Sequence, residues 1–389
     1  MRRRQRVLVV FAILAGAIAG IAALTATSME SKGPLSSLLE RSASAIGAIE
    51  HAARRKIVGS ERAGALAWLE PNRKRLEYLK NPDRILFGAY DGGIPQTLDG
   101  IVDLERDLNT VFPLIHFYAA WGDKPEQQFP LQLVTAIWDL GSVPVITWEP
   151  WLDDFENAVH PAIPLRGRRD LHGLGEVSRG TYDFYIDEWA KAAARFKRPL
   201  YLRFAHEMND PYRYSWGPQN NSKEEYIAAW RHVVERFRSA GAGNVIWVWA
   251  PHVAYEYWDL YYPGDQYTDW IATGALNYGP IAYWSKWWGF DEIFGQKYPR
   301  MAEFGKPIMI AEFGSLAVGG DREAWYASAL DEIGTAPAVK AVLLFNKRDD
   351  QTVTAQRIDW TFAGDSAISK VVAAKIRELT ISGPKVLRD

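Results

Sequence analysis

The sequence predicts an α/β protein that folds as a (β/α)8 TIM barrel. Eight short apolar runs recur along the chain, and segments with helical periodicity separate them. Parallel strands covered by helices are buried on both faces, so they read as continuous apolar runs. The expected strands are 85–90, 114–121, 143–148, 200–206, 245–250, 270–276, 307–311 and 339–345.

The segments between these runs favour the barrel over a doubly wound open sheet. Residues 222–240 begin with Ser222 and Glu225 at capping-box spacing and stop at Gly241, and 182–197 has the same periodicity. An open sheet of the nucleotide-binding type would carry a glycine-rich phosphate loop after its first strand. Glycines do follow that strand, but Ile94 and Pro95 come next instead of a helix start, so we expect no dinucleotide site.

The N-terminus predicts export. Four arginines within the first six residues precede an apolar run over 7–24. This run is longer than the roughly 7–15 residues of a signal-peptide core, so residues 1–30 are expected to be an uncleaved signal-anchor helix or a removed signal. Either places the body of the protein outside the cytoplasm, on the periplasmic face of the inner membrane if anchored, or secreted if cleaved.

Three further regions follow from composition. Residues 31–81 are rich in Ala, Glu, Arg and Leu with helical spacing, which predicts a helical stalk or a helix packed under the barrel. Residues 82–380 hold the barrel, and 381–389 form a C-terminal tail.

Composition also restricts the function. The formal net charge of −2 argues against nucleic acid as the main partner. The chain has no cysteine, and its seven histidines show no ligand spacing, so we expect neither a metal nor a cofactor. Tryptophan and tyrosine are abundant, at 17 and 18 residues. Aromatic faces in a groove suit a sugar-binding cleft, although most large aromatics fill cores.

Two glutamates end buried strands. Glu207 follows the fourth apolar run and Glu312 follows the seventh. A carboxylate at that position is costly unless it faces a cleft or a partner. The carboxyl ends of barrel strands meet at one mouth, where active sites lie. Paired carboxylates there indicate a general acid and a nucleophile, as in glycoside hydrolysis, with two structural ion pairs as the alternative.

Four sequence blocks carry a family resemblance. They are RFAHEMN at 203–209, WVWAPH at 247–252, YYPGDQYTDW at 261–270 and IAEFG at 310–314. In this order they resemble glycoside hydrolase family 26, which contains retaining endo-β-mannanases, mixed-linkage β-glucanases and β-1,3-xylanases on a (β/α)8 barrel. The resemblance implies Glu207 as acid/base and Glu312 as nucleophile.

Other residues take expected roles in substrate binding. His206 resembles the family histidine that contacts sugar at the cleavage point, and Trp216 resembles a stacking tryptophan whose alternative role is to anchor its loop. Arg203 is expected to face the same way as Glu207, because strand side chains alternate, and to hold a carboxylate in its charged form. Asn209 is expected to fix the acid loop or to terminate the strand. Four more candidates lie near strand ends: Trp121, Trp151, Trp249 and His252.

One position departs from the family pattern. After the sixth strand the family usually places a tyrosine that hydrogen-bonds the nucleophile, whereas this chain has Leu276. A leucine has no donor, so either Tyr278 substitutes for it or the nucleophile is tuned differently. The loop with Arg166, Arg168 and Arg169 is a second unusual feature, which suits either an acidic polysaccharide or solvent.

These observations predict a retaining endo-β-glycanase that cleaves β-1,4-mannan or β-1,3-1,4-glucan outside the cytoplasm. Its partners would be the polysaccharide, the inner membrane through residues 7–24, and a possible polysaccharide synthase or export complex. The alternative is a non-catalytic or weakly catalytic glycan-binding subunit of such a complex.

Overall fold

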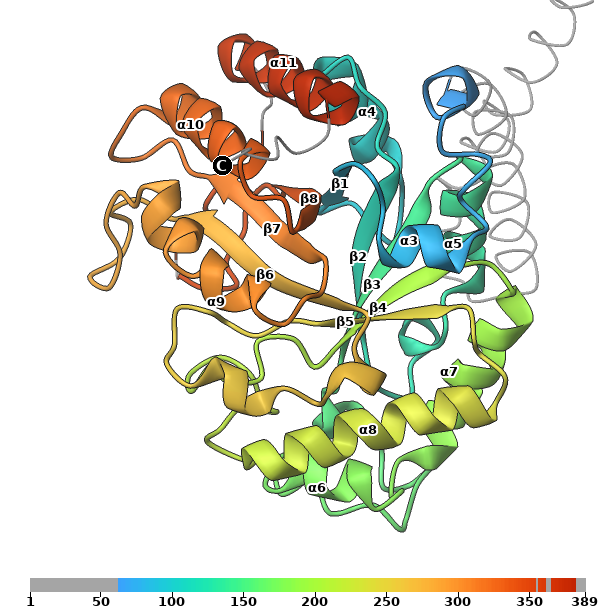
Figure 1. The fold of residues 1–389 in the computed structure, drawn as a ribbon. Coiled ribbons are helices and arrows are strands. Elements are labelled where there is room, and N and C mark those ends of the chain that lie inside the picture. The colour runs from blue at the N-terminus through green and yellow to red at the C-terminus, as the bar shows by residue number, and fades with distance from the viewer. Residues whose placement is uncertain (1–61, 355, 362–364, 383–389) are drawn as a thin grey trace, which may run out of the picture. The chain divides into compact units, whose positions relative to one another are not determined.

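The expected barrel is present in the computed structural model, which describes residues 62–354, 356–361 and 365–382. Eight parallel strands pair in chain order, and β8 closes on β1 (Figure 1). The strands are β1 (Leu86–Asp91), β2 (Leu114–Ala120), β3 (Val143–Glu149), β4 (Leu200–Phe204), β5 (Val245–Trp249), β6 (Trp270–Asn277), β7 (Ile308–Ser315) and β8 (Val339–Asn346).

The end of β4 differs from the expectation. The strand stops at Phe204, because Ala205 and Glu207 adopt left-handed backbone conformations with φ of 43° and 51°. Strand alternation therefore does not extend from Arg203 to Glu207, and the argument that placed both on one face by parity is wrong. Non-glycine residues with positive φ are strained, and such strain concentrates at functional sites.

Helices surround the strands (Figure 1). The N-terminus of α8 has the predicted capping box, in which Ser222 accepts from the backbone N–H of Glu225 and Glu225 accepts from that of Ser222. The helices are α3 (Leu76–Lys80), α4 (Asp99–Asp107), α5 (Leu131–Asp139), α6 (Gly173–Ser178), α7 (Asp183–Phe196), α8 (Lys223–Ser239), α9 (Tyr298–Ala302), α10 (Arg322–Gly334) and α11 (Ser366–Ser382).

Residues 62–81 pack against the amino-terminal end of the barrel. The Leu79 carbonyl accepts hydrogen bonds from Tyr201 at 2.7 Å and from Trp270 at 3.1 Å, and the Leu79 side chain is fully buried. Arg62 forms a buried ion pair with Glu105 at 2.7 Å. The expected leader over 7–24 and residues 31–61 of the expected stalk lie outside the described residues.

Much of the aromatic content fills the core. Trp121, Trp148 and Trp189 are almost fully buried, and the ring centroid of Trp148 lies 4.6 Å from that of Trp121 and 4.7 Å from that of Trp189. Such rings each bury a large apolar area, so this cluster stabilises the barrel near β2, β3 and α7.

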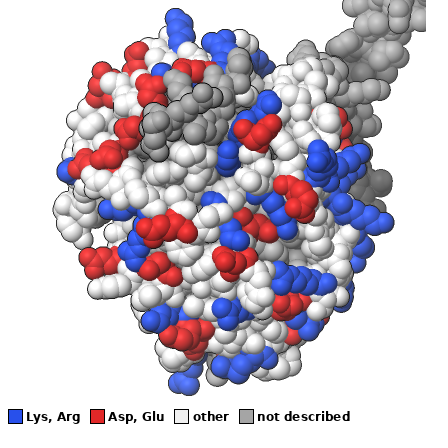
Figure 2. All heavy atoms as spheres, in the orientation of Figure 1, with Lys and Arg blue, Asp and Glu red and all other residues white. Residues whose placement is uncertain are grey.

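The described surface carries both signs of charge. Acidic and basic side chains are interspersed on the face shown in Figure 2. Among the helices of the described residues, none combines the length and the apolarity needed to cross a bilayer.

Candidate active site

Glu207 and Glu312 border the same space at the mouth of the barrel. A Cβ built on Gly274 would lie 3.8 Å from Glu207 Oε1 and 3.9 Å from Glu312 Cβ. Each glutamate is 7% exposed. The registry between β6 and β7 shifts between Thr273 and Gly274, next to this space. Bulges of this kind re-aim side chains beside active sites, and the absence of a side chain at Gly274 leaves the space open.

Glu312 is held in its charged form. Arg203 donates to its Oε1 at 2.7 Å and to Thr147 at 2.7 Å, and the Tyr118 hydroxyl also hydrogen-bonds to Glu312. Burial alone would raise the pKa of Glu312, but the charge and hydrogen bond of Arg203, together with Tyr118, keep that pKa below its usual value. An ionised carboxylate at the mouth is the form that a nucleophile requires.

Glu207 has a different environment. Its oxygen Oε2 lies 3.5 Å from the guanidinium of Arg213, and its backbone N–H donates to the Ala250 carbonyl at 2.7 Å. Asn209 donates to the His252 carbonyl at 2.9 Å and accepts from the His252 N–H at 2.8 Å. Asn209 therefore ties the loop after β4 to the loop after β5, which supports its expected role in fixing the acid loop.

Tyr118 on β2 supplies the phenol that the sequence pattern lacks on β6. Its hydrogen bond to Glu312 lowers the pKa of Glu312 and contributes to raising that of Tyr118, behind burial and the charge of Glu312. Leu276 instead packs against the small apolar cluster that contains Trp360. The charges of both glutamates contribute to raising the pKa of Tyr278, but the hydroxyl that hydrogen-bonds to Glu312 is that of Tyr118.

His206 is buried and neutral. Burial lowers its pKa well below the usual value, and the charges of Arg203 and Arg213 add to this effect. Its Nε2 lies 3.0 Å from the Tyr214 hydroxyl, and its ring is 1% exposed. An uncharged imidazole beside the acid can exchange hydrogen bonds with a sugar hydroxyl without binding an anion.

Three of the candidate tryptophans are buried, and for Trp216 this agrees with its alternative role as a loop anchor. Trp216 is 2% exposed and donates to the His206 carbonyl at 2.7 Å, so it anchors its loop and does not present a face to sugar. Trp121 and Trp249 are fully buried in the core. A position near a strand end in the sequence did not predict whether a side chain faces the mouth of the barrel or the core. Trp151 is half-buried, its ring meets Trp216 edge-on at 4.8 Å, and it remains a candidate for sugar contact.

Glu149 is a third carboxyl group at the mouth that our sequence argument missed. It ends β3, accepts a hydrogen bond from Trp151 at 3.1 Å and is partly exposed. Desolvation raises its pKa to about 7, against the lowering effects of Trp151 and Arg203. The rule that selected Glu207 and Glu312, an acid directly after an apolar strand, also fits Glu149.

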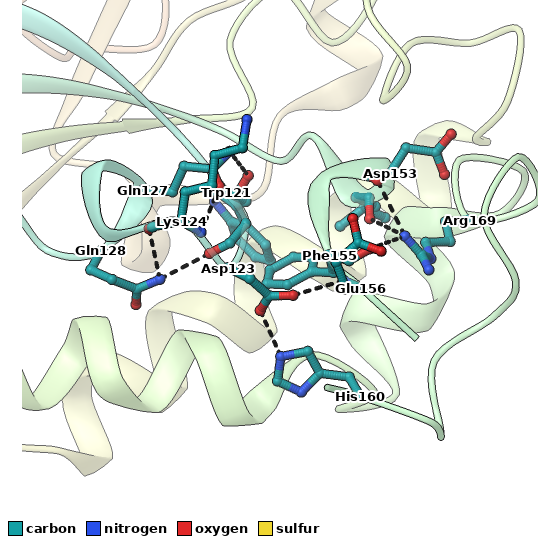
Figure 3. Close-up of polar contacts among 12 residues, drawn as sticks. Trp121, Asp123, Lys124, Gln127, Gln128, Asp153, Phe155, Glu156, His160 and Arg169 are labelled. Carbon is teal, nitrogen blue, oxygen red and sulfur yellow. Dashed lines mark hydrogen bonds and ion pairs between the residues drawn. The ribbon is translucent and has the colours of Figure 1, made fainter. Parts of the chain in front are cut away.

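The arginine loop has one buried member. Arg169 is 1% exposed and donates to the carbonyls of Pro164 at 2.8 Å and Asp153 at 3.2 Å (Figure 3). Asp123, after β2, accepts from the Glu156 N–H at 2.7 Å and lies 2.7 Å from His160 Nε2. Arg169 therefore holds this loop together by hydrogen bonds to its backbone, whereas Arg166 and Arg168 are exposed.

One group in the described residues has the composition of a metal site. Ligand atoms of Glu207, Asp210 and His252 all lie within 4.8 Å of one another. The guanidinium of Arg213, 3.5 Å from Glu207, opposes a cation there, and an Asp210 oxygen already accepts the Tyr212 N–H at 2.7 Å. We therefore assign no metal to this group.

Comparison with known proteins identifies the barrel. Residues 180–317, which contain both glutamates, match the model of glycosyl hydrolase family 26. Over these residues the chain is similar to this family. The chain is 32% identical to endoglucanase H of Acetivibrio thermocellus over 257 residues, which cover 64% of this chain and 26% of that protein.

Two further proteins are similar over shorter regions or in fold alone. Mannan endo-1,4-beta-mannosidase A and B of Caldalkalibacillus mannanilyticus is 30% identical over 124 residues, 30% of this chain and 21% of that protein. The structure of a family 26 β-mannanase from Bacteroides ovatus matches with a TM-score of 0.55 and 19% identity, covering 84% of this chain and 94% of that one. The chain spans about a quarter of the length of endoglucanase H and about a fifth of that of the mannosidase.

Proposed function

We propose that this protein is a retaining endo-β-glycanase that hydrolyses internal linkages of a β-linked polysaccharide. The observation that carries the proposal is the space beside Gly274, which Glu207 and Glu312 both border. In retaining hydrolysis two carboxyl groups flank the scissile bond, one as acid/base and one as nucleophile. The two glutamates differ as this division of labour requires, because Arg203 and Tyr118 stabilise charge on Glu312.

The reaction has two displacements. Glu312 attacks the anomeric carbon and forms a covalent glycosyl ester, while Glu207 gives its proton to the departing glycosidic oxygen. Glu207 then removes a proton from water, the hydroxide attacks the same carbon, and the ester bond to Glu312 breaks. The product keeps its anomeric configuration. Arg203 stabilises Glu312 as an anion before attack and again when it leaves.

A β-glucan with mixed β-1,3-1,4 linkages is the first substrate we propose, with β-1,4-mannan second. The similarity to endoglucanase H extends over 257 residues, whereas that to the mannan endo-1,4-beta-mannosidase extends over 124. The action is proposed to occur outside the cytoplasm, because of the basic and apolar N-terminal sequence. N-terminal sequencing of the protein from membrane and soluble fractions tests this location.

Release of reducing ends from mixed-linkage glucan, mannan and β-1,3-xylan tests the activity. Glu312→Gln is expected to abolish cleavage of polysaccharides and of dinitrophenyl glycosides alike, because no nucleophile remains. Glu207→Gln is expected to lose about 10²–10⁴-fold on polysaccharides but far less on dinitrophenyl glycosides, whose leaving group needs no acid. Glu188→Gln, at an exposed position on α7, is the control.

Two results would contradict the proposal. Inversion of configuration in the first turnover, seen by NMR, excludes the role given to Glu312. Binding of a glycan without hydrolysis of any of the three polymers supports a glycan-binding subunit instead.

A further inference from the structure

The loop between β6 and the next helical turn exposes large aromatic side chains. Tyr283 is 102% exposed and Trp284 is 44% exposed, and both follow the carboxyl end of β6 within a few residues. In Figure 1 this loop extends beyond the strand end on the left of the barrel. Apolar surface gathered at one place outside the core marks a binding site more often than chance exposure.

Trp284 packs against Tyr278, a ring at the edge of the small apolar cluster that also contacts Tyr118. Its ring meets that of Tyr278 edge-on, with centroids 5.3 Å apart, and Tyr278 in turn meets Trp360 at 5.0 Å. Burial raises the pKa of Tyr278, and the charges of Glu312 and Glu207 add to this effect while that of Arg213 opposes it. Tyr118, which hydrogen-bonds to Glu312, packs against the same apolar cluster as Tyr278, so the aromatic side chains continue from Glu312 toward Trp284.

Close backbone contacts fix the loop that carries Trp284. A Cβ on Gly279 would lie 2.0 Å from the Val318 carbonyl oxygen, and one on Gly320 would lie 2.2 Å from the Trp287 ring. Asn277 accepts the N–H groups of Gly279 and Trp288, each at 3.1 Å. These contacts require glycine and hold the loop after β6 against the loop after β7. A fixed aromatic loses little entropy when it binds a ligand.

We propose that Trp284 forms a sugar-stacking subsite, which extends the cleft along the loop after β6 and binds a distal unit of a β-linked polysaccharide. A pyranose unit has a flat face of C–H groups that packs on an aromatic ring, and its hydroxyls stay in solvent at a half-exposed site. The aromatic side chains that run from Tyr118, beside Glu312, through Tyr278 to Trp284 match a polysaccharide that crosses the mouth. This subsite rests on the proposed function and deepens it, because it requires a substrate of several units.

Binding measured in an inactive background tests the subsite. Calorimetry on full-length Glu312→Gln protein would compare β-1,3-1,4-glucan oligosaccharides of three and six units, with and without the additional change Trp284→Ala. We expect Trp284→Ala to weaken binding of the six-unit sugar about tenfold, the size of one aromatic contact, and to leave the three-unit sugar unaffected. Trp284→Phe is expected to restore most of the loss.

Trp68→Ala is the matched control. Trp68 is also a partly exposed tryptophan, but it packs under Arg84 before β1, at the opposite end of the barrel. The subsite would be overturned if Trp68→Ala and Trp284→Ala weakened binding of the six-unit sugar equally, or if Trp284→Ala weakened binding of the three-unit and six-unit sugars alike. Neither result would contradict hydrolysis by the parent protein. Absence of both hydrolysis and binding in the parent protein would instead overturn the proposed function and the subsite together.

Discussion

Arg203 of β4 and Glu312 of β7 form a buried ion pair across the interior of the barrel, with Nη2 and Oε1 2.7 Å apart. The Arg203 side chain is 1% exposed and that of Glu312 is 10% exposed. A buried pair of this kind contributes little net stability compared with apolar residues of similar volume. Removing one partner is costly, however, because it leaves the other charge buried without a counter-ion. Its value to this molecule is that it keeps Glu312 ionised at the mouth.

Replacing Arg203 tests the pair. Arg203→Ala is expected to reduce the free energy of unfolding at pH 7 by about 3–5 kcal/mol, because Glu312 then lies buried without its counter-ion. Urea unfolding followed by tryptophan fluorescence measures this change. Arg106→Ala, which removes an exposed pair with Asp103, is the control and should cost less than about 1 kcal/mol.

The effect of Arg203→Ala should depend on pH. The pKa of Glu312 is lowered in the folded protein, so its contribution to stability is present above the ordinary carboxyl pKa and disappears as pH falls through the lowered value. The stability difference between the parent protein and Arg203→Ala should therefore shrink in acid. A difference that stayed constant down to the lowest pH at which the protein folds would contradict the charge argument.

Tyr118 offers a second test of the role proposed for Glu312. Tyr118→Phe keeps the ring against Tyr90 and His116 but removes the hydroxyl that hydrogen-bonds to Glu312. Hydrogen bonds to charged groups contribute about 1.5–3 kcal/mol, so kcat/KM should fall roughly tenfold to a hundredfold. The acidic limb of the pH profile should move to higher pH, because the pKa of Glu312 rises.

A matched variant separates this effect from a general loss of hydroxyl groups. Tyr226→Phe also removes a buried phenol hydroxyl, and among the described residues the hydroxyl of Tyr226 forms no hydrogen bond to a carboxylate. It should leave the acidic limb in place. If Tyr118→Phe and Tyr226→Phe had the same pH profile, Tyr118 would have no role in tuning Glu312.

The strands could be predicted from the sequence because burial on both faces leaves an apolar signal that does not depend on partners. The two glutamates could be predicted for the same reason, since each interrupts such a run. The turn after β4 could not, because nothing in the composition of 205–207 signals a left-handed backbone. Tyr118 was missed because an inward tyrosine within a strand looks like any core aromatic.

Contacts between loops were the least predictable part of the site. Trp121, Trp216 and Trp249 all lie near strand ends, yet packing with other rings buries them. Glu149 could have been predicted, because it follows an apolar run as the other two glutamates do. The partners of Arg169 are backbone carbonyls, which carry no sequence signature at all.

The loop after β3 should depend on Arg169 alone among its arginines. Arg169→Ala leaves several backbone carbonyls without their donor, at about 1–3 kcal/mol for each one that water cannot reach. We expect faster proteolysis within 152–172 and a lower melting temperature. Arg168→Ala, at an exposed position one residue away, should change neither. Equal protease resistance of the two variants would show that Arg169 does not fix this loop.

Glu149 should make stability fall as pH rises toward neutral. Its pKa in the folded protein is about 7, above the ordinary value of 4.5, so the folded state binds a proton that the unfolded state has already released. The resulting contribution is complete below the ordinary value and is lost as pH rises through about 7. Glu149→Gln removes this dependence. Between pH 4.5 and pH 8, the free energy of unfolding of the variant should therefore increase relative to that of the parent, by up to about 3 kcal/mol.

Thermal unfolding of both proteins across this pH range measures the Glu149 effect. Glu188→Gln provides the control, because Glu188 is 62% exposed and pairs only with Lys191 among the ion pairs described for it. Its curve should run parallel to that of the parent. Parallel curves for Glu149→Gln as well would mean that Glu149 is solvated at the mouth and ionises there like a surface carboxylate.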